Sequence, residues 1–372
     1  MSPSLASQRF YQIALSMLPS IGSVLAQNLL AYCGSCENVF KMSKSRLQRV
    51  PGIGEDRAAR IVSSDVLKRA EKELKFLERE NIVPLFFTDE AFPQRLKQCA
   101  DMPLLLYYNG CADLNVTKVV SVIGTRKVSE YGKEQTLAIV KSLAAAQVLV
   151  VSGLAYGVDI LAHKAALDCG LNTVGVLGHG LNQLYPGQHK STATKMLEQG
   201  GLLTEFCTQD EFTPHNFPQR NRIVAGMCDA VIVVESAAAG GAMLTSRNAG
   251  SYHRDVFAVP GRITDKASAG CNLLIAQNEA TIFTSVENFL AAMNWDGEER
   301  IIMPKGGQLP LIIEEPMASI VAVLRGKESV EIDVLAGTIG LSPSATATAL
   351  LEMEMNNWIV ALPGKRFRLI GG

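Results

Sequence analysis

Six short apolar runs, separated by longer stretches of mixed polarity, mark the middle of the chain. They lie at 119–123, 148–152, 173–177, 202–204, 230–235 and 256–260. The runs are continuous rather than alternating, which is typical of strands buried on both faces of a parallel sheet. Helical patterns separate most of them. This alternation predicts an α/β protein with a Rossmann-like parallel sheet as its core.

The first 82 residues predict an all-α domain. A two-part repeat, Leu18-Pro-Ser-Ile-Gly22 and Val50-Pro-Gly-Ile-Gly54, is followed each time by a helical pattern, and an amphipathic charged segment occupies 66–82. The repeat resembles a SAM-like helix-hairpin-helix, whose turn can offer backbone N–H groups to a DNA phosphate. The alternative is a helical hairpin used only for packing. Only the second copy carries arginines, which are Arg49, Arg57 and Arg60.

The end of the chain predicts a separate small module. The stretch 303–316 is rich in Pro and Gly, as linkers are, and 317–372 has the pattern of three helices followed by a hairpin, which resembles a winged helix. The third helix of this module contains two glutamates and neither Lys nor Arg. Since acidic side chains repel phosphates, we expect a protein-interaction or weak auxiliary element rather than a reader of DNA grooves.

These patterns give the predicted domain limits. We expect a helix-hairpin-helix domain at 1–82, an extended Rossmann-like DNA-binding domain at 83–302, a linker at 303–316 and a winged-helix-like domain at 317–372.

The net charge does not identify a binding partner, whereas the cysteines indicate the cellular compartment. The formal net charge is −1, so binding of nucleic acid would need a local basic patch. The eight cysteines suit free thiols in a reducing compartment. Cys33 and Cys36 are spaced as in a redox motif or as one half of a zinc site. The alternative is that they are two structural thiols. Since the sequence has neither a secretion signal nor an apolar run of membrane-spanning length, we expect a cytoplasmic protein with no membrane partner.

Glycines and polar side chains follow every predicted strand. Gly124-Thr125-Arg126 follows the first, Ser152-Gly153 the second and Gly178-His179-Gly180 the third. Ligands of open α/β sheets bind beyond the carboxyl ends of the strands, where helix N-termini attract anions. We therefore expect a pocket for a phosphorylated ligand. Arg126 should emerge over it at the start of the next helix, whose N-terminus would also favour an anion.

Known nucleotide fingerprints and catalytic constellations are missing from these loops. Neither GxGxxG nor GxxxxGK[ST] occurs, and the five histidines are spread without metal-ligand spacing. We expect no cofactor, no metal and no catalytic residue. The main alternative is a nucleotide or nucleoside-phosphate hydrolase of the lysine-decarboxylase-like group, although its PGGxGTxxE run is replaced by Ser236-Ala-Ala-Ala-Gly-Gly241. A purely structural adaptor is the third possibility.

The motifs taken together resemble the DprA/Smf (DNA-processing A) family. They match its pattern in order and spacing, as GTR at 124–126, SGLAYGVD at 152–159, GHGLNQLYPGQH at 178–189, FPQRNRIVAG at 217–226, VVESAAAGGAMLTSRNA at 233–249, VFAVPGR at 256–262 and GCNLLI at 270–275. The resemblance implies a non-enzymatic protein of natural transformation that binds and protects incoming single-stranded DNA. It also implies loading of a RecA-type recombinase and a homodimer formed through the Rossmann-like domain.

The resemblance also assigns site residues. Arg126 would hold phosphate, and so would Arg220 and Arg222, unless they form internal salt bridges to Glu205 or Glu235. Tyr156, Tyr185 and Phe217 are candidates for stacking on bases. Asp159 and Glu205 are expected to cap or orient loops. The predicted DNA- and phosphate-binding residues are Gly124, Thr125, Arg126, Lys127, Ser152, Gly153, Gly178, Gly180, Lys190, Phe217, Arg220, Asn221, Arg222, Gly240 and Gly241.

Overall fold

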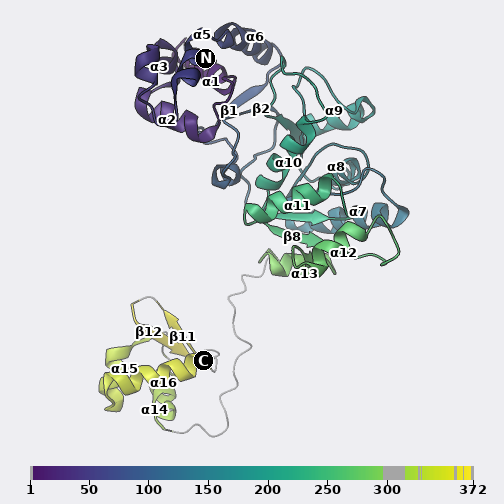
Figure 1. Cartoon of the computed structure of the whole chain (residues 1–372). Coiled ribbons are helices and arrows are strands. Elements are labelled where there is room, and N and C mark those ends of the chain that lie inside the picture. Colours follow the sequence, from purple (N-terminus) through teal and green to yellow (C-terminus); the bar gives the residue numbers. More distant parts are fainter. Residues whose placement is uncertain are drawn as a thin grey trace. The chain divides into compact units, whose positions relative to one another are not determined.

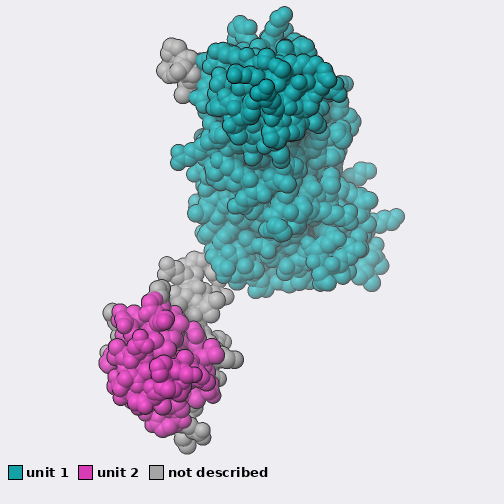
Figure 2. All heavy atoms as spheres, turned by 60° about the vertical axis from the view of Figure 1, so that its left-hand side comes forward, with its two compact units in different colours: residues 1–295 teal, residues 296–372 magenta. Residues whose placement is uncertain are grey.

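The structure is a computed structural model that describes residues 3–295, 315–325, 327, 329–355, 358–362 and 364–369. The chain divides into two compact units, 1–295 and 296–372 (Figure 2). Most of the predicted linker, 303–314, lies outside the described residues, and so does Pro363 of the predicted hairpin. The predicted fold class is confirmed, since helices precede a largely parallel sheet and a small winged-helix module follows it. The predicted domain limits stay predictions.

A nine-stranded sheet of order β1-β2-β6-β5-β4-β3-β7-β8-β9 forms the centre of the first unit. Strands β3 to β9 are parallel, whereas β1 and β2 form an antiparallel extension at one edge. The chain runs outward from β3 to β6 and then returns to place β7 on the other side of β3. The gap between β3 and β7 is therefore the topological switch point of the sheet. The strands are β1 (Val83–Phe86), β2 (Leu105–Gly110), β3 (Val119–Ile123), β4 (Leu149–Ser152), β5 (Thr173–Val176), β6 (Gly200–Thr204), β7 (Ala230–Val233), β8 (Asp255–Ala258) and β9 (Thr281–Ile282).

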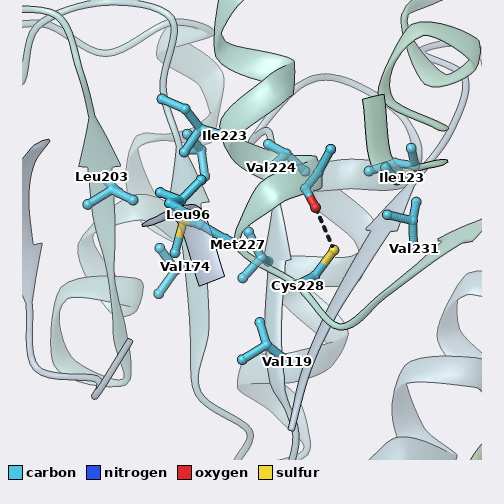
Figure 3. Close-up of a cluster of buried hydrophobic side chains, with 14 of the residues drawn as sticks. Leu96, Val119, Ile123, Val174, Leu203, Ile223, Val224, Met227, Cys228 and Val231 are labelled. Atoms are coloured by element: carbon cyan, nitrogen blue, oxygen red, sulfur yellow. Dashed lines mark hydrogen bonds between the residues drawn. The ribbon is translucent and has the colours of Figure 1, made fainter. Parts of the chain in front are cut away.

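Helices cover both faces of the parallel strands (Figure 1). Val120 and Val122 of β3 pack in one apolar cluster with α7, α8 and α13, and Val119 and Ile123 pack in another with α10, α11 and α12. Figure 3 shows part of the second cluster, in which Ile223 of α10 belongs to the same core as Val119. Burial on both faces explains why these strands are continuous apolar runs. The elements are η1 (Gln94–Gln98), α7 (Glu130–Leu143), η2 (Ala144–Ala146), α8 (Val158–Asp168), η3 (Gly187–His189), α9 (Lys190–Glu198), α10 (Asn216–Gly226), α11 (Gly241–Ser251), α12 (Ala269–Ala276) and α13 (Val286–Ala292).

The helical part of the first unit contains the predicted repeat. Its helices are α1 (Pro3–Ser16), α2 (Ser23–Cys33), α3 (Cys36–Lys41), α4 (Lys44–Leu47), α5 (Glu55–Ser63) and α6 (Val66–Arg79). Gly22 and Gly54 are the N-caps of α2 and α5, so each copy of the repeat starts a helix. The thiols of Cys33 and Cys36 are free and buried, and burial raises the pKa of Cys36 to about 11. This environment suits two structural thiols better than a redox pair.

A buried carboxylate, Glu73 of α6, joins the helices to the loop after β6. It accepts a hydrogen bond from the backbone N–H of Thr208 at 3.0 Å and another from the Thr208 hydroxyl. Beside it Arg69 pairs with Asp210 at 3.4 Å. Burial raises the pKa of Glu73, and the bonds from Thr208 offset only part of that rise. The charged form of Glu73 is therefore disfavoured in the native state.

The raised pKa of Glu73 predicts that the stability of the protein depends on pH. The native group binds its proton at a higher pH than the unfolded group, whose pKa is near 4.5. The wild-type free energy of unfolding should therefore fall as the pH rises through the interval above that value. Glu73→Gln removes this titration, so the stability of the wild type minus that of the variant should decrease over the same interval in urea unfolding. A difference independent of pH would contradict this reading.

The second unit has the topology of a winged helix. Strand β10 follows the first helix, two more helices follow β10, and the hairpin of β11 and β12 completes an antiparallel sheet of order β10-β12-β11. Ile320, Leu335 and Leu350 are buried in the common core. The third helix carries Glu352 and Glu354, whereas Lys365, Arg366 and Arg368 lie on the hairpin. The elements are α14 (Met317–Leu324), β10 (Val330–Glu331), α15 (Ile332–Ile339), α16 (Pro343–Met355), β11 (Ile359–Leu362) and β12 (Arg366–Leu369).

Across the described residues, no single helix has the length and apolarity needed to cross a membrane, and the pair α15 and α16 meets that test only when joined across a bend of 111°.

Candidate nucleic-acid interface

A cavity of about 620 Å³ lies at the carboxyl ends of β3 and β7. Its walls are the loop after β3, the loop after β4, the loop 236–241 after β7 and one side of α10. We name it the switch-point cavity, because it occupies the place where open α/β sheets bind ligands. The loop after β5 contributes Tyr185 to the lining, whereas Glu205 after β6 and Gly261 after β8 do not line the cavity.

Nine of the predicted site residues line this cavity. They are Gly124, Thr125, Arg126, Gly153, Phe217, Arg220, Asn221, Gly240 and Gly241. Gly178 lies just behind, where an added Cβ would be 3.1 Å from the ring of Phe217.

The other predicted residues do not line it. Lys127 and Lys190 are exposed next to the loop after β3 and at the start of α9. Ser152 is buried and donates to the carbonyl of Val122 at 2.7 Å. Gly180 packs against the loop at Cys207, and Arg222 lies outside the lining of this cavity.

The helix after β3 does not offer a free N-terminus, which corrects the prediction for Arg126. Helix α7 begins only at Glu130, and the Glu235 carboxylate accepts from the backbone N–H of Ser129 at 2.9 Å. A Cβ on Gly132 would lie 2.3 Å from this carboxylate, so the glycine makes room for it. The carboxylate of Glu235 thus occupies the N-terminus of α7, where a bound anion was predicted.

Helix α11 presents the open N-terminus instead. Its N-cap is Gly240, with no capping side chain and no acidic residue in the first turn. Added Cβ atoms on Gly240 and Gly241 would meet only side-chain atoms, at 3.7 and 3.6 Å, so the backbone is approachable. Both glycines line the switch-point cavity. Since the first amides of a helix lack partners within it, they can bind an anion here.

Arg220 is an internal link rather than a free cation. It is only 3% exposed, and its guanidinium donates to the carbonyls of Gly153 and Val176, at the ends of β4 and β5. Burial lowers its pKa to about 10, and Asp159 opposes that change. Asp159 accepts from the N–H of Gly153 at 3.1 Å, as expected for a residue that orients a loop.

Arg222 faces another part of the molecule. It forms a salt bridge with Glu205 and also donates to the carbonyl of Asp101. The internal partner considered for this arginine in the sequence analysis is thus present.

Arg126 is the exposed cation of the cavity, and aromatic rings lie beside it. Its guanidinium carbon is 5.5 Å from the centre of the Phe217 ring. The rings of Phe217, Tyr185 and Phe212 are mutual neighbours, with centres 5.3 to 5.8 Å apart. Tyr156 instead contacts the His189 ring at 5.1 Å. Sequence reasoning missed Phe212, although an aromatic residue in the polar stretch before Phe217 was a usable signal.

Comparisons with known proteins identify the family of each part of the chain. Residues 84–294 match the family model of the DNA recombination-mediator protein A. Residues 13–64 match a SAM-like helix-hairpin-helix tandem, and residues 313–365 match the DprA winged helix domain. All three parts of the predicted fold therefore have a counterpart among known domains.

Relatives are found along most of the chain. It is 34% identical over 309 residues to Protein Smf of Escherichia coli, with 81% of each chain covered. The X-ray structure of DprA from Streptococcus pneumoniae matches with a TM-score of 0.64 and 32% identity, over 76% of this chain and 95% of that one. DprA from Helicobacter pylori, whose single-stranded DNA binding mode has been described, matches with a TM-score of 0.53 and 28% identity, over 58% and 96%. The resemblance predicted from the motifs is confirmed, and this chain belongs to the DprA/Smf family of DNA-processing proteins.

Proposed function

We propose that the chain binds single-stranded DNA in the switch-point cavity. A backbone phosphate would lie on the free amides of α11 and the guanidinium of Arg126, where a helix N-terminus and an exposed cation reinforce each other. Bases would stack on the neighbouring rings of Phe217, Tyr185 and Phe212. The observation that carries the proposal is the position of Arg126, which lines the cavity and lies over the Phe217 ring.

The cavity suits a binding protein better than a hydrolase. A hydrolase commonly uses a His, Asp or Glu side chain as the general base that acts on water or substrate. Among the residues that line this cavity, Asp159 is the one such side chain. Asp159 and Glu235 are instead engaged with backbone N–H groups of Gly153 and Ser129, at 3.1 and 2.9 Å. We therefore propose that the protein is not an enzyme.

The wider role rests on the family. As the resemblance implies, the protein would act in the cytoplasm as a homodimer, protect incoming strands during natural transformation and load a RecA-type recombinase. Lys127 and Lys190 would extend the contact along the DNA strand, because both side chains are exposed. What supports this role is the match of the chain to the recombination-mediator family over residues 84–294.

Oligonucleotide binding tests the proposal. Fluorescence anisotropy should give a lower Kd for a labelled dT oligomer than for a blunt duplex of equal length, because a flexible strand can enter the cavity and a stiff duplex cannot. The affinity should fall steeply with salt. Mononucleotides should compete only weakly, which separates this function from the nucleotide hydrolase. Equal affinity for the dT oligomer and the duplex would refute it.

A further inference from the structure

A second cavity, of about 530 Å³, lies where the first helical hairpin meets the sheet. We name it the junction cavity. One wall is the turn at Ile21 and the first turn of α2, and another is the segment 100–105 that leads into β2. The Arg222–Glu205 pair completes the lining. This cavity shares no lining residue with the switch-point cavity.

The ion pair keeps unused hydrogen-bonding capacity. Oε1 of Glu205 is buried and has no hydrogen-bond partner among the described residues. Arg222 uses two of its terminal nitrogens, on Glu205 and on the carbonyl of Asp101, whereas a guanidinium carries five N–H donors. The two side chains are 19% and 17% exposed, so both reach the cavity surface. Since the last torsion of a glutamate is soft, the carboxylate can rotate to turn this oxygen toward the cavity, and part of the Oε2 contact with Arg222 is then exchanged for the contact with a ligand.

Helix α2 adds backbone donors to the same wall. Its N-cap is Gly22, without a capping side chain, and its first turn has no acidic residue. The second copy of the repeat differs, because Glu55 and Asp56 occupy the first turn of α5. The first turn of α2 thus faces the junction cavity without an acidic side chain of its own, and Arg222 of the Rossmann-like part supplies the cation.

The charges favour a neutral ligand with both donors and acceptors. A phosphate would lie against the Glu205 carboxylate, which offsets the attraction of Arg222. A nucleobase does not meet this repulsion, and apolar residues such as Ile21, Val24 and Met102 line the cavity around the pair. Guanine presents the O6 and N7 acceptors that arginine binds and amino and imino N–H groups that suit a carboxylate. Thymine offers a single N–H, so it matches the pair less well.

One strand of DNA could reach both cavities. Glu205 follows β6 and Gly124 follows β3, on the same edge of the sheet, with β5 and β4 between them. Three spacings between neighbouring β-strands amount to roughly 14 Å, a distance that a few nucleotides of DNA can span. Helix α10 separates the two sites, with Asn221 lining the switch-point cavity and Arg222 the junction cavity.

We propose that the junction cavity is a base-reading subsite that accepts a guanine of the strand held in the switch-point cavity. This proposal rests on the proposed function. It gives an otherwise sequence-neutral protein a modest preference for guanine-containing strands.

The test compares two labelled 20-mers, one of dT only and one of alternating dT and dG, by anisotropy with the full chain. We expect about tenfold tighter binding of the dT/dG strand, within the range of one good base contact. Glu205→Gln and Val24→Trp should abolish this ratio and leave the dT affinity within about twofold. Val24 is 63% exposed, so tryptophan there fills the cavity from outside without disturbing the core.

The outcomes separate this proposal from the proposed function. Failure to bind either strand would refute single-strand binding itself. Equal binding of both strands by the wild type would refute only the guanine subsite. A preference that survives in both variants would place base reading elsewhere and refute it equally. Arg126→Ala is the matched control, and it should weaken both strands by the same factor.

Discussion

Arg126→Ala should weaken binding of single-stranded DNA by roughly 1.5–3 kcal/mol, or about 10- to 150-fold in Kd. The reason is that Arg126 is exposed, lines the switch-point cavity and has the Phe217 ring beside its guanidinium at 5.5 Å. A guanidinium can donate two hydrogen bonds to one phosphate while its plane stacks on a ring. The dependence of log Kd on log salt should also become shallower by about one phosphate contact.

Two further variants serve as controls for Arg126→Ala. Arg126→Lys should recover only part of the affinity, because an ammonium cannot form the two-bond contact. Arg79→Ala removes the same charge from α6, where the arginine side chain is 70% exposed, and should leave the Kd nearly unchanged. The melting temperature should be the same for all three variants. If Arg126→Ala instead lowers the melting temperature and spares the affinity, Arg126 is a structural residue and the phosphate lies elsewhere.

The strands and the edge where they end could be predicted from the sequence because both depend on local patterns. Continuous apolar runs required a sheet covered on both faces, and the glycines at 124, 153 and 240–241 lie at the resulting cavity. The antiparallel addition of β1 and β2 to β6 was not predictable in this way, since strand pairing joins residues far apart in the chain.

The electrostatic details of the site could not be predicted for the same reason. Glu235 reaches Ser129 across 106 residues and so closes the N-terminus of α7. The N-terminus of α11, in contrast, has no capping side chain. Likewise Arg222 meets Glu205 and Arg220 meets Gly153 only in the folded chain. A sequence motif identifies arginines on one helix, but the folded surroundings decide whether each guanidinium is available to a ligand.

Arg220 provides the second large expected effect, this time on stability. Arg220→Ala should lower the free energy of unfolding by about 2–6 kcal/mol, because two carbonyl groups inside the protein lose a donor, at about 1–3 kcal/mol each. The partly buried carbonyl of Gly153 and the buried carbonyl of Val176 lose their donor, and Asp159 loses the positive charge that stabilises its carboxylate. Urea unfolding measures the loss. Gly153→Ala should act in the same direction, since the new methyl group would lie 2.5 Å from the Arg220 guanidinium.

A double mutant distinguishes an internal link from a direct contact with DNA. If Arg220 mainly balances Asp159, then Arg220→Ala combined with Asp159→Asn should be less destabilising than the sum of the two single changes. DNA affinity per folded molecule should fall as well, because Arg220 holds the loop at Gly153 that lines the switch-point cavity. The opposite result is equally clear. An Arg220→Ala protein that keeps its urea midpoint and loses only DNA binding would make this arginine a phosphate ligand, as its place in the FPQRNR motif first implied.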